Sequence, residues 1–152
     1  MKIVVVSGGF DPIHSGHIAY FVNAKDYGNK LIVALNSDQW LIDKKGKFFM
    51  PFSERKTIIE NLSVVDKVID FEDDNYGSAS NALEKIKKLF PKDEIIFANG
   101  GDRSDTSKIL EYDTAQEFNI ELKFGIGGNH KESSSSDLLG RWEEYIKNKT
   151  KD

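Results

Sequence analysis

Five short runs of β-branched and aliphatic residues, separated by stretches with helical features, are spread along the whole chain. Each run is of the length and composition expected for a strand buried on both faces of a sheet. The runs are residues 3–6, 31–35, 67–71, 94–98 and 120–124. Such alternation predicts an α/β fold, in which a parallel sheet of five strands is covered by helices on both faces through right-handed crossovers. Ligands of these sheets bind beyond the carboxyl ends of the strands.

Four of the intervening segments predict helices, because each has a capping residue or an apolar stripe at helical spacing. One follows Ser15 as N-cap, one follows Pro51 with Ser53 as N-cap, one carries Leu83, Ile86, Leu89 and Phe90 before Pro91, and one near 136–147 has Leu138, Trp142, Tyr145 and Ile146 on one face. With 152 residues and no repeat or linker, we expect one domain over 1–152.

Composition narrows the function classes. The chain has no cysteine and three histidines, so neither disulfides nor a zinc site are expected. No apolar run is long enough to span a membrane, and the N-terminus enters a strand directly, so a cytoplasmic protein without a membrane partner is expected. A net charge of −4 argues against charge-driven binding of nucleic acid, although residues 25–56 hold seven basic and four acidic residues.

The segment Gly-Gly-Phe-Asp-Pro-Ile-His-Ser-Gly-His, residues 8–17, lies between the first strand and the first helix. Free backbone N–H groups and the positive end of the helix dipole converge at such a junction, which therefore binds phosphate well. His14 and His17 are three residues apart and can face the same side once the helix has begun. A phosphate approaching Gly8 and Gly9 would meet both rings as hydrogen-bond donors. The segment predicts a site that holds and polarises a polyphosphate.

Residues 9–17 also resemble the HxGH signature of the cytidylyltransferase-like nucleotidyltransferases, which include glycerol-3-phosphate cytidylyltransferase and the heptose-1-phosphate adenylyltransferase domain. The resemblance implies a Rossmann-like domain that moves a nucleotidyl group from an NTP to a phosphate and releases pyrophosphate. It implies that His14 and His17 are catalytic. It also implies that Gly8, Gly9, Phe10, Asp11 and Gly16 bind the nucleotide. The alternative for the two histidines is local packing or capping at the start of a helix.

The resemblance also implies roles for two further segments, one rich in lysine and one that contains Arg55. Members of the family carry mobile lysines after the second strand, which implies that Lys44 and Lys47 reach the triphosphate, with Lys45 as a near rival. A solvated surface loop is the alternative. The family often places an arginine where Arg55 stands. This residue is expected either to contact the acceptor phosphate through a bidentate pair or to fix its helix to the active-site loop; an ordinary surface arginine or an internal salt bridge is the alternative.

The last two motifs follow the fourth and fifth strands. Gly101 and Asp102 resemble residues beside the nucleotide in the heptose-phosphate group, although a plain turn is the alternative. The run 133–136 resembles the serine motif that opens the last helix of the family and binds the β- and γ-phosphates, which implies roles for Ser134, Ser135 and Ser136. The register of this run is open by one residue, and His130 and Lys131 are the candidates to replace the arginine that the family carries before the motif.

The resemblance implies in-line attack by an acceptor phosphate on the α-phosphorus of CTP or ATP, with Mg²⁺ carried mainly on the NTP phosphates. A small sugar or polyol phosphate is the expected acceptor. An adenylyltransferase acting on nicotinate mononucleotide or phosphopantetheine, and a non-catalytic nucleotide-binding module, are the alternatives; the loop 125–128 lacks the glycine pattern of an NAD site. An apolar surplus at Phe48, Phe49, Met50 and Phe52 makes a homodimer possible.

Overall fold

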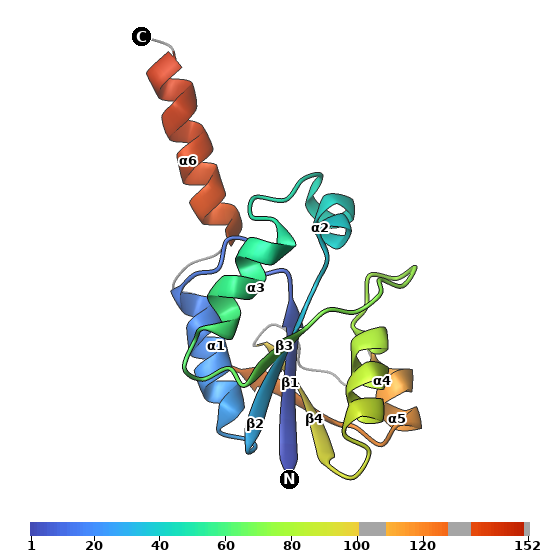
Figure 1. Cartoon of the computed structure of the whole chain (residues 1–152). Coiled ribbons are helices and arrows are strands. Elements are labelled where there is room, and N and C mark those ends of the chain that lie inside the picture. The colour runs from blue at the N-terminus through green and yellow to red at the C-terminus, as the bar shows by residue number, and fades with distance from the viewer. Residues whose placement is uncertain (101–108, 128–134, 151–152) are drawn as a thin grey trace.

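The computed structural model describes residues 1–100, 109–127 and 135–150. Its sheet is five-stranded, with every pairing parallel and the order β3-β2-β1-β4-β5 (Figure 1). The strands are β1 (Lys2–Gly8), β2 (Lys30–Leu35), β3 (Lys67–Ile69), β4 (Glu94–Gly100) and β5 (Glu121–Ile126). The predicted fold class, a Rossmann-like α/β sheet with helices on both faces, is confirmed.

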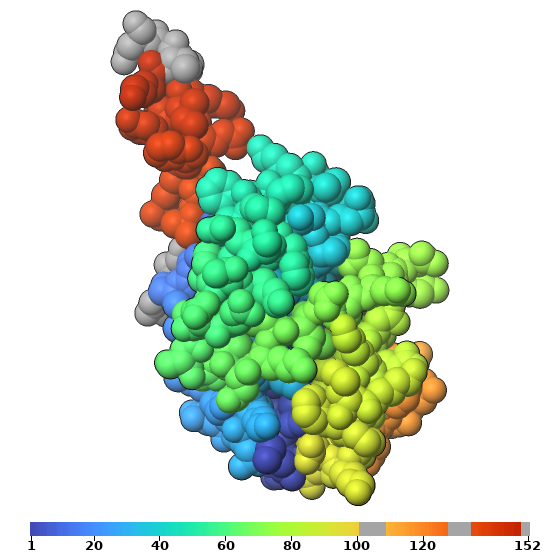
Figure 2. All heavy atoms as spheres, viewed as in Figure 1, coloured from blue at the N-terminus to red at the C-terminus, as the bar shows by residue number. Residues whose placement is uncertain are grey.

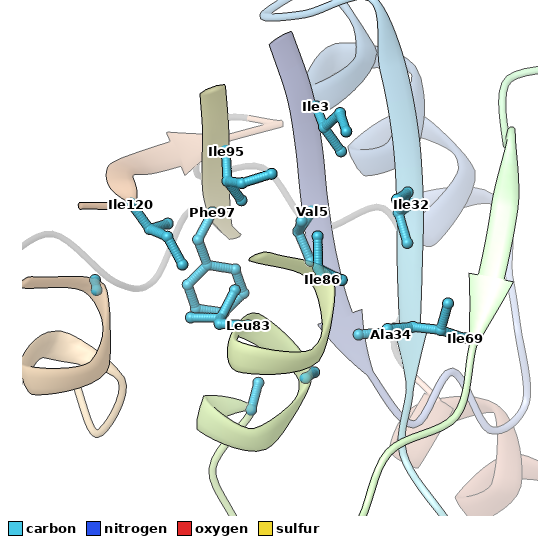
Figure 3. Packing of buried hydrophobic residues seen from close by; sticks show 13 residues of the cluster. Ile3, Val5, Ile32, Ala34, Ile69, Leu83, Ile86, Ile95, Phe97 and Ile120 are labelled. Atoms are coloured by element: carbon cyan, nitrogen blue, oxygen red, sulfur yellow. The ribbon is translucent and has the colours of Figure 1, made fainter. Parts of the chain in front are cut away.

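The described helices are α1 (Ser15–Lys25), α2 (Asp38–Lys45), α3 (Phe52–Glu60), α4 (Ser80–Leu89), α5 (Tyr112–Glu117) and α6 (Ser135–Thr150). Helices α1 and α3 cover one face of the sheet, and α4 and α5 cover the other. Successive residues of β1 enter opposite cores, because strand side chains alternate between faces: Val5 packs with Phe97 and with Leu83 and Ile86 of α4 (Figure 3), whereas Val4 belongs to the core under α1 and α3. None of the described helices is long and apolar enough to cross a membrane.

The structure corrects several sequence expectations about the helices. His14, not Ser15, is the N-cap of α1, and Pro51, not Ser53, is that of α3. Leu89 was expected on the buried stripe of α4 but is half exposed. Helices α2 and α5 were not predicted, because both are short and each buries a single side chain, which leaves no apolar stripe to detect.

Helix α6 forms where the sequence predicts a helix, but its apolar stripe is not buried. Leu138, Trp142, Tyr145 and Ile146 are all exposed. Figure 1 shows α6 projecting from the rest of the molecule, beyond the end of the sheet to which the carboxyl ends of the strands point. Periodicity therefore located this helix correctly, although the helix does not contribute this stripe to the core.

Candidate active site

The strand order places the switch point of the sheet between β1 and β4, since the chain proceeds from β1 to β2 on one side and β4 lies on the other. A crevice beyond the carboxyl ends of the strands at such a point is the usual ligand site of open α/β sheets. The loop that follows β1 carries the two histidines of the motif, so the sequence-predicted site lies where the topology favours ligand binding.

His14 and His17 cap the helix that they begin. The Nδ1 atom of His14 accepts the N–H of Gly16 at 3.1 Å, and the Nδ1 atom of His17 accepts the N–H of His14 at 3.2 Å. The two imidazoles stack, with ring centroids 3.8 Å apart and planes at 26°. This reciprocal capping satisfies two N–H groups that a helix start leaves without partners, and it holds both rings in one orientation.

The capping bonds also determine where each ring carries its proton. An Nδ1 atom that accepts an N–H has no proton of its own, so each neutral ring carries its proton on Nε2. Burial lowers the pKa of His14. Burial, followed by the charges of His14 and Lys45, lowers the pKa of His17 to about 3. Near neutral pH the motif therefore presents two uncharged imidazoles, each with an Nε2–H group available as a donor.

Packing accounts for the glycines and the phenylalanine of the motif. Phe10 is buried with its ring edge-on to His17, at a centroid distance of 4.9 Å, and it has a left-handed φ of 50°. A Cβ on Gly8 would lie 2.8 Å from this ring, and a Cβ on Gly9 would lie 2.6 Å from Leu41 of α2. The two glycines thus allow close packing of the motif loop against Phe10 and against α2, a requirement that is separate from the expected approach of a phosphate.

Asp11, expected to bind the nucleotide, is buried and fastens the motif loop to a second loop. Its two carboxylate oxygens accept the N–H groups of Phe49 and Met50 at 2.5 and 2.7 Å. These bonds stabilise the buried carboxylate and fix the segment between α2 and α3 beside the histidines. Tyr20 of α1 similarly donates its hydroxyl to the carbonyl of Ala98 in β4, across the switch point.

Arg55 lies at the centre of this part of the fold, with its side chain fully buried. Its guanidinium donates to the carbonyls of Met50, Gly9 and Asn36 at 2.8–2.9 Å and to Asp38 Oδ1 at 2.7 Å. These four bonds join the loops after β1 and β2 and the start of α2. The bond to Asp38 is the internal salt bridge that the sequence analysis gave as the alternative, and the bond to Gly9 also joins the helix of Arg55 to the loop that carries the histidines; contact with an acceptor phosphate stays a prediction. Sequence reasoning missed Asp38, although its position just after β2 was the available signal.

The lysine segment begins within a helix, so the expectation of a loop is wrong for residues 43–45. Helix α2 ends at Lys45, and Gly46 follows with a left-handed φ of 88°. Lys45 is the lysine whose charge contributes to the low pKa of His17. The Nζ atom of Lys44 lies 4.6 Å from the ring centroid of Trp40, and Lys47 is exposed beyond the helix end. Lys45, the near rival in the sequence analysis, therefore lies close enough to His17 for its charge to act on that ring.

The serine motif reaches the histidine loop through one contact that the structure describes. Ser135 donates its hydroxyl to the carbonyl of Pro12 at 2.8 Å, which brings the N-terminus of α6 to the loop that carries His14. Ser136 is exposed in the first turn of α6. Gly101, Asp102, His130, Lys131 and Ser134, to which the sequence also assigns roles, lie outside the described residues. Among the residues described, no three His, Cys, Asp or Glu side chains gather as a metal cluster.

The chain is similar to several known proteins. Bifunctional protein HldE from Enterobacter sp. (strain 638) is 36% identical over 112 residues, which cover 66% of this chain and 24% of that protein. The chain therefore spans about a quarter of the length of the curated relatives it matches. A solved lipopolysaccharide core biosynthesis protein from Thermoplasma volcanium GSS1 is 26% identical with a TM-score of 0.60, covering 82% of this chain and 94% of that one.

A bifunctional NMN adenylyltransferase/ADP ribose pyrophosphatase from Francisella tularensis, solved with AMP and a manganese ion, shares the fold. Its TM-score is 0.64 at 18% identity, and the match covers 92% of this chain and 41% of that one. Residues 5–118, from β1 through α5, match the family model described as cytidylyltransferase-like. The chain belongs to the cytidylyltransferase-like family.

Proposed function

We propose that this chain, acting as a single domain over residues 1–152, transfers a nucleotidyl group from CTP or ATP to the phosphate of a small sugar or polyol and releases pyrophosphate. The observation that carries the proposal is the stacked pair of neutral imidazoles, whose Nδ1 atoms are occupied by helix-capping bonds. Two Nε2–H donors held this way at the switch point suit the phosphate oxygens of a bound NTP.

In the proposed reaction, an oxygen of the acceptor phosphate attacks the α-phosphorus of the NTP. A new P–O bond forms as the bond from the α-phosphorus to the bridging oxygen breaks, and that oxygen leaves with pyrophosphate. The acceptor is already anionic, so no base is needed to create the nucleophile. Catalysis then rests on positioning and on stabilising charge that grows on the phosphate oxygens.

Each group of residues has a task in this reaction. The Nε2–H groups of His14 and His17 donate to the α- and β-phosphate oxygens, and their positions require no reorganisation because the capping bonds hold the rings. Lys45, together with Lys44 and Lys47, supplies positive charge from the end of α2. Residues 134–136, at the start of α6, bind the departing pyrophosphate, and Gly101 and Asp102 contact the nucleotide. Mg²⁺ enters with the substrate as Mg·NTP.

The sugar phosphate is proposed as acceptor for two reasons. The motifs resemble those of heptose-1-phosphate and glycerol-3-phosphate nucleotidyltransferases, and the similar Thermoplasma protein is described as a lipopolysaccharide core biosynthesis protein. Likeness to the NMN adenylyltransferase is a likeness of fold, so nicotinamide and nicotinate mononucleotides serve as competing acceptors in the test.

The experiment measures pyrophosphate released by the full chain with each of CTP, ATP, GTP and UTP, combined with Mg²⁺ and a panel of acceptors. The panel contains heptose, hexose and polyol phosphates, the two pyridine mononucleotides and phosphopantetheine. Turnover with a sugar or polyol phosphate, lost in His14→Asn, supports the proposal. Turnover confined to mononucleotide or phosphopantetheine acceptors would replace the proposed acceptor class, and NTP binding without turnover on any acceptor would indicate a binding module.

A further inference from the structure

Trp40 lies in the first turn of α2, and its indole bridges two segments at the carboxyl edge of the sheet. The indole Nε1–H donates to the carbonyl of Gly77, in the segment between β3 and α4, at 2.9 Å. The other end of the ring system packs on the motif loop, because a Cβ on Gly9 would lie 3.2 Å from Cζ3 of Trp40. The side chain is therefore held at both ends, beside the loop that carries His14 and His17.

The segment between β3 and α4 that receives this bond is fastened to α2 at a second point. Ser37, the N-cap of α2, donates its hydroxyl to Asp73 Oδ2 at 2.5 Å. Within the segment, Asp74 accepts the N–H groups of Tyr76 and Ser78 at 3.0 and 2.9 Å. Figure 2 shows atoms of α2, in cyan, against those of this segment, in light green. The indole thus stands on a fixed frame, and such preorganisation lowers the entropic cost of binding a ligand.

A lysine lies over the face of this indole. The Nζ atom of Lys44, one turn further along α2, is 4.6 Å from the ring centroid of Trp40. The face of an aromatic ring is the negative part of its quadrupole, so it attracts a cation. For the same reason it attracts the polarised C–H groups of a sugar ring, to which it also offers a flat apolar surface. A sugar ring and the Lys44 ammonium would therefore compete for one face of Trp40.

We propose that Trp40 is the platform on which the ring of the acceptor sugar stacks, and that this stacking releases Lys44 toward the phosphates. The proposal rests on the proposed function and narrows it to a cyclic sugar phosphate as acceptor. A closed ring holds several C–H groups against the indole at once, whereas an open-chain polyol does not. Lys44 carries a compact charge on a flexible stem, so the arrival of the sugar ring places that charge on the phosphate oxygens when both substrates are bound.

A purely structural role for Trp40, as a clamp between α2 and the segment after β3, uses a different part of the side chain. The clamp depends on Nε1–H, whereas stacking depends on the ring face. Trp40→Phe keeps an aromatic face and removes the donor, and Trp40→Leu removes both. We expect the KM for the acceptor to stay within about threefold in Trp40→Phe and to rise about tenfold or more in Trp40→Leu. An equal rise in both variants would mean that the clamp alone matters and would overturn the proposal.

The assay measures pyrophosphate released by the full chain with hexose and heptose phosphates, and with glycerol 3-phosphate as the acyclic acceptor. The sugar phosphates are expected to have the lower KM in the wild-type chain and to lose this advantage in Trp40→Leu. Tyr27→Leu is the matched control. The ring of Tyr27 also has a lysine over it, with Nζ of Lys123 at 5.7 Å, but Tyr27 lies between α1 and β2, at the opposite edge of the sheet. This control should leave the KM for every acceptor unchanged.

A fluorescence titration tests the platform without turnover. The chain has two tryptophans, so Trp142→Phe leaves Trp40 as the single reporter. Hexose and heptose phosphates should shift its emission to shorter wavelength, because a stacked ring removes water from the indole; inorganic phosphate, which has no ring, should not.

The two readouts distinguish failure of the platform from failure of the proposed function. Turnover of a sugar phosphate with no emission shift and an unchanged acceptor KM in Trp40→Leu would refute the platform alone. An emission shift without pyrophosphate release on any acceptor would support the platform and refute the proposed reaction. Absence of both signals with every sugar phosphate would refute both.

Discussion

Replacement of His14 separates the two tasks that the structure gives to this side chain. The Nδ1 atom accepts the N–H of Gly16 at 3.1 Å and so caps α1, whereas the Nε2–H group is the proposed phosphate donor. His14→Ala removes both groups. His14→Asn retains the cap, because the Oδ1 atom of asparagine takes the place of Nδ1 and asparagine is a strong N-cap. His14→Gln loses the cap but retains a donor, since the longer glutamine side chain carries its amide nitrogen to the region of Nε2.

The three variants therefore have different expected signatures. Loss of the cap costs about 1 kcal/mol, which lowers the melting temperature of a domain of this size by about 2–4 °C. We expect that shift for Ala and Gln and no such shift for Asn. Loss of the Nε2–H donor lowers kcat/KM by about 10²–10³-fold, which we expect for Ala and Asn, with partial recovery in Gln. Thermal unfolding and pyrophosphate release measure the two effects. If His14→Asn turned over within fivefold of the wild-type rate, the assigned donor role would be wrong.

Three further predictions follow from the same geometry. Lys45→Ala should lower kcat/KM for the NTP at least tenfold and leave the melting temperature nearly unchanged, because the side chain is exposed. It should also raise the pKa of His17, which NMR titration checks. If Lys45→Ala lowered kcat/KM less than Lys47→Ala, Lys47 would be the more important of the two lysines. Arg55→Met should cost about 3–5 kcal/mol in urea unfolding, because Asp38 and three carbonyls lose their buried donor; a loss below about 1 kcal/mol would contradict the bridging role. The fold should also lose stability as pH falls from 6.5 toward 3: the unfolded chain takes up a proton at His17 in this window whereas the folded chain, with the pKa of His17 at about 3, does not. The slope is about 1.4 kcal/mol per pH unit, and a His17→Asn chain with the same slope would refute this assignment.

Much of the site could be predicted from local patterns. The positions of β1 and α1 follow from the apolar run before Gly8 and the stripe after His17, and the phosphate-binding character of the junction follows from helix physics. The same junction predicts the two histidines as donors to a phosphate, and the motif resemblance added their catalytic role. Capping by imidazole was harder to anticipate, because serine is a much commoner N-cap, so Ser15 was favoured although His14 takes the position.

Contacts between distant segments could not be predicted in the same way. Nothing local to Arg55 says that its guanidinium meets Gly9, 46 residues away, or that Asp11 accepts the N–H of Phe49. Neither pattern nor composition could choose among the three lysines, since the choice depends on where α2 ends in space. The expected apolar face of α6 was located correctly, but its exposure depends on the direction in which the helix leaves the body.

The sequence by itself determined the fold class, the places of the five strands and of four helices, and the junction where the chemistry is placed, because strand period, helix period and the residues at a strand–helix turn are local properties of a chain. Only the tertiary structure decided that Arg55 and Asp11 fasten the surrounding loops, and that α6 is left with an uncovered face. Those outcomes depend on packing between residues tens of positions apart, and the free energy of such contacts is a property of the assembled fold.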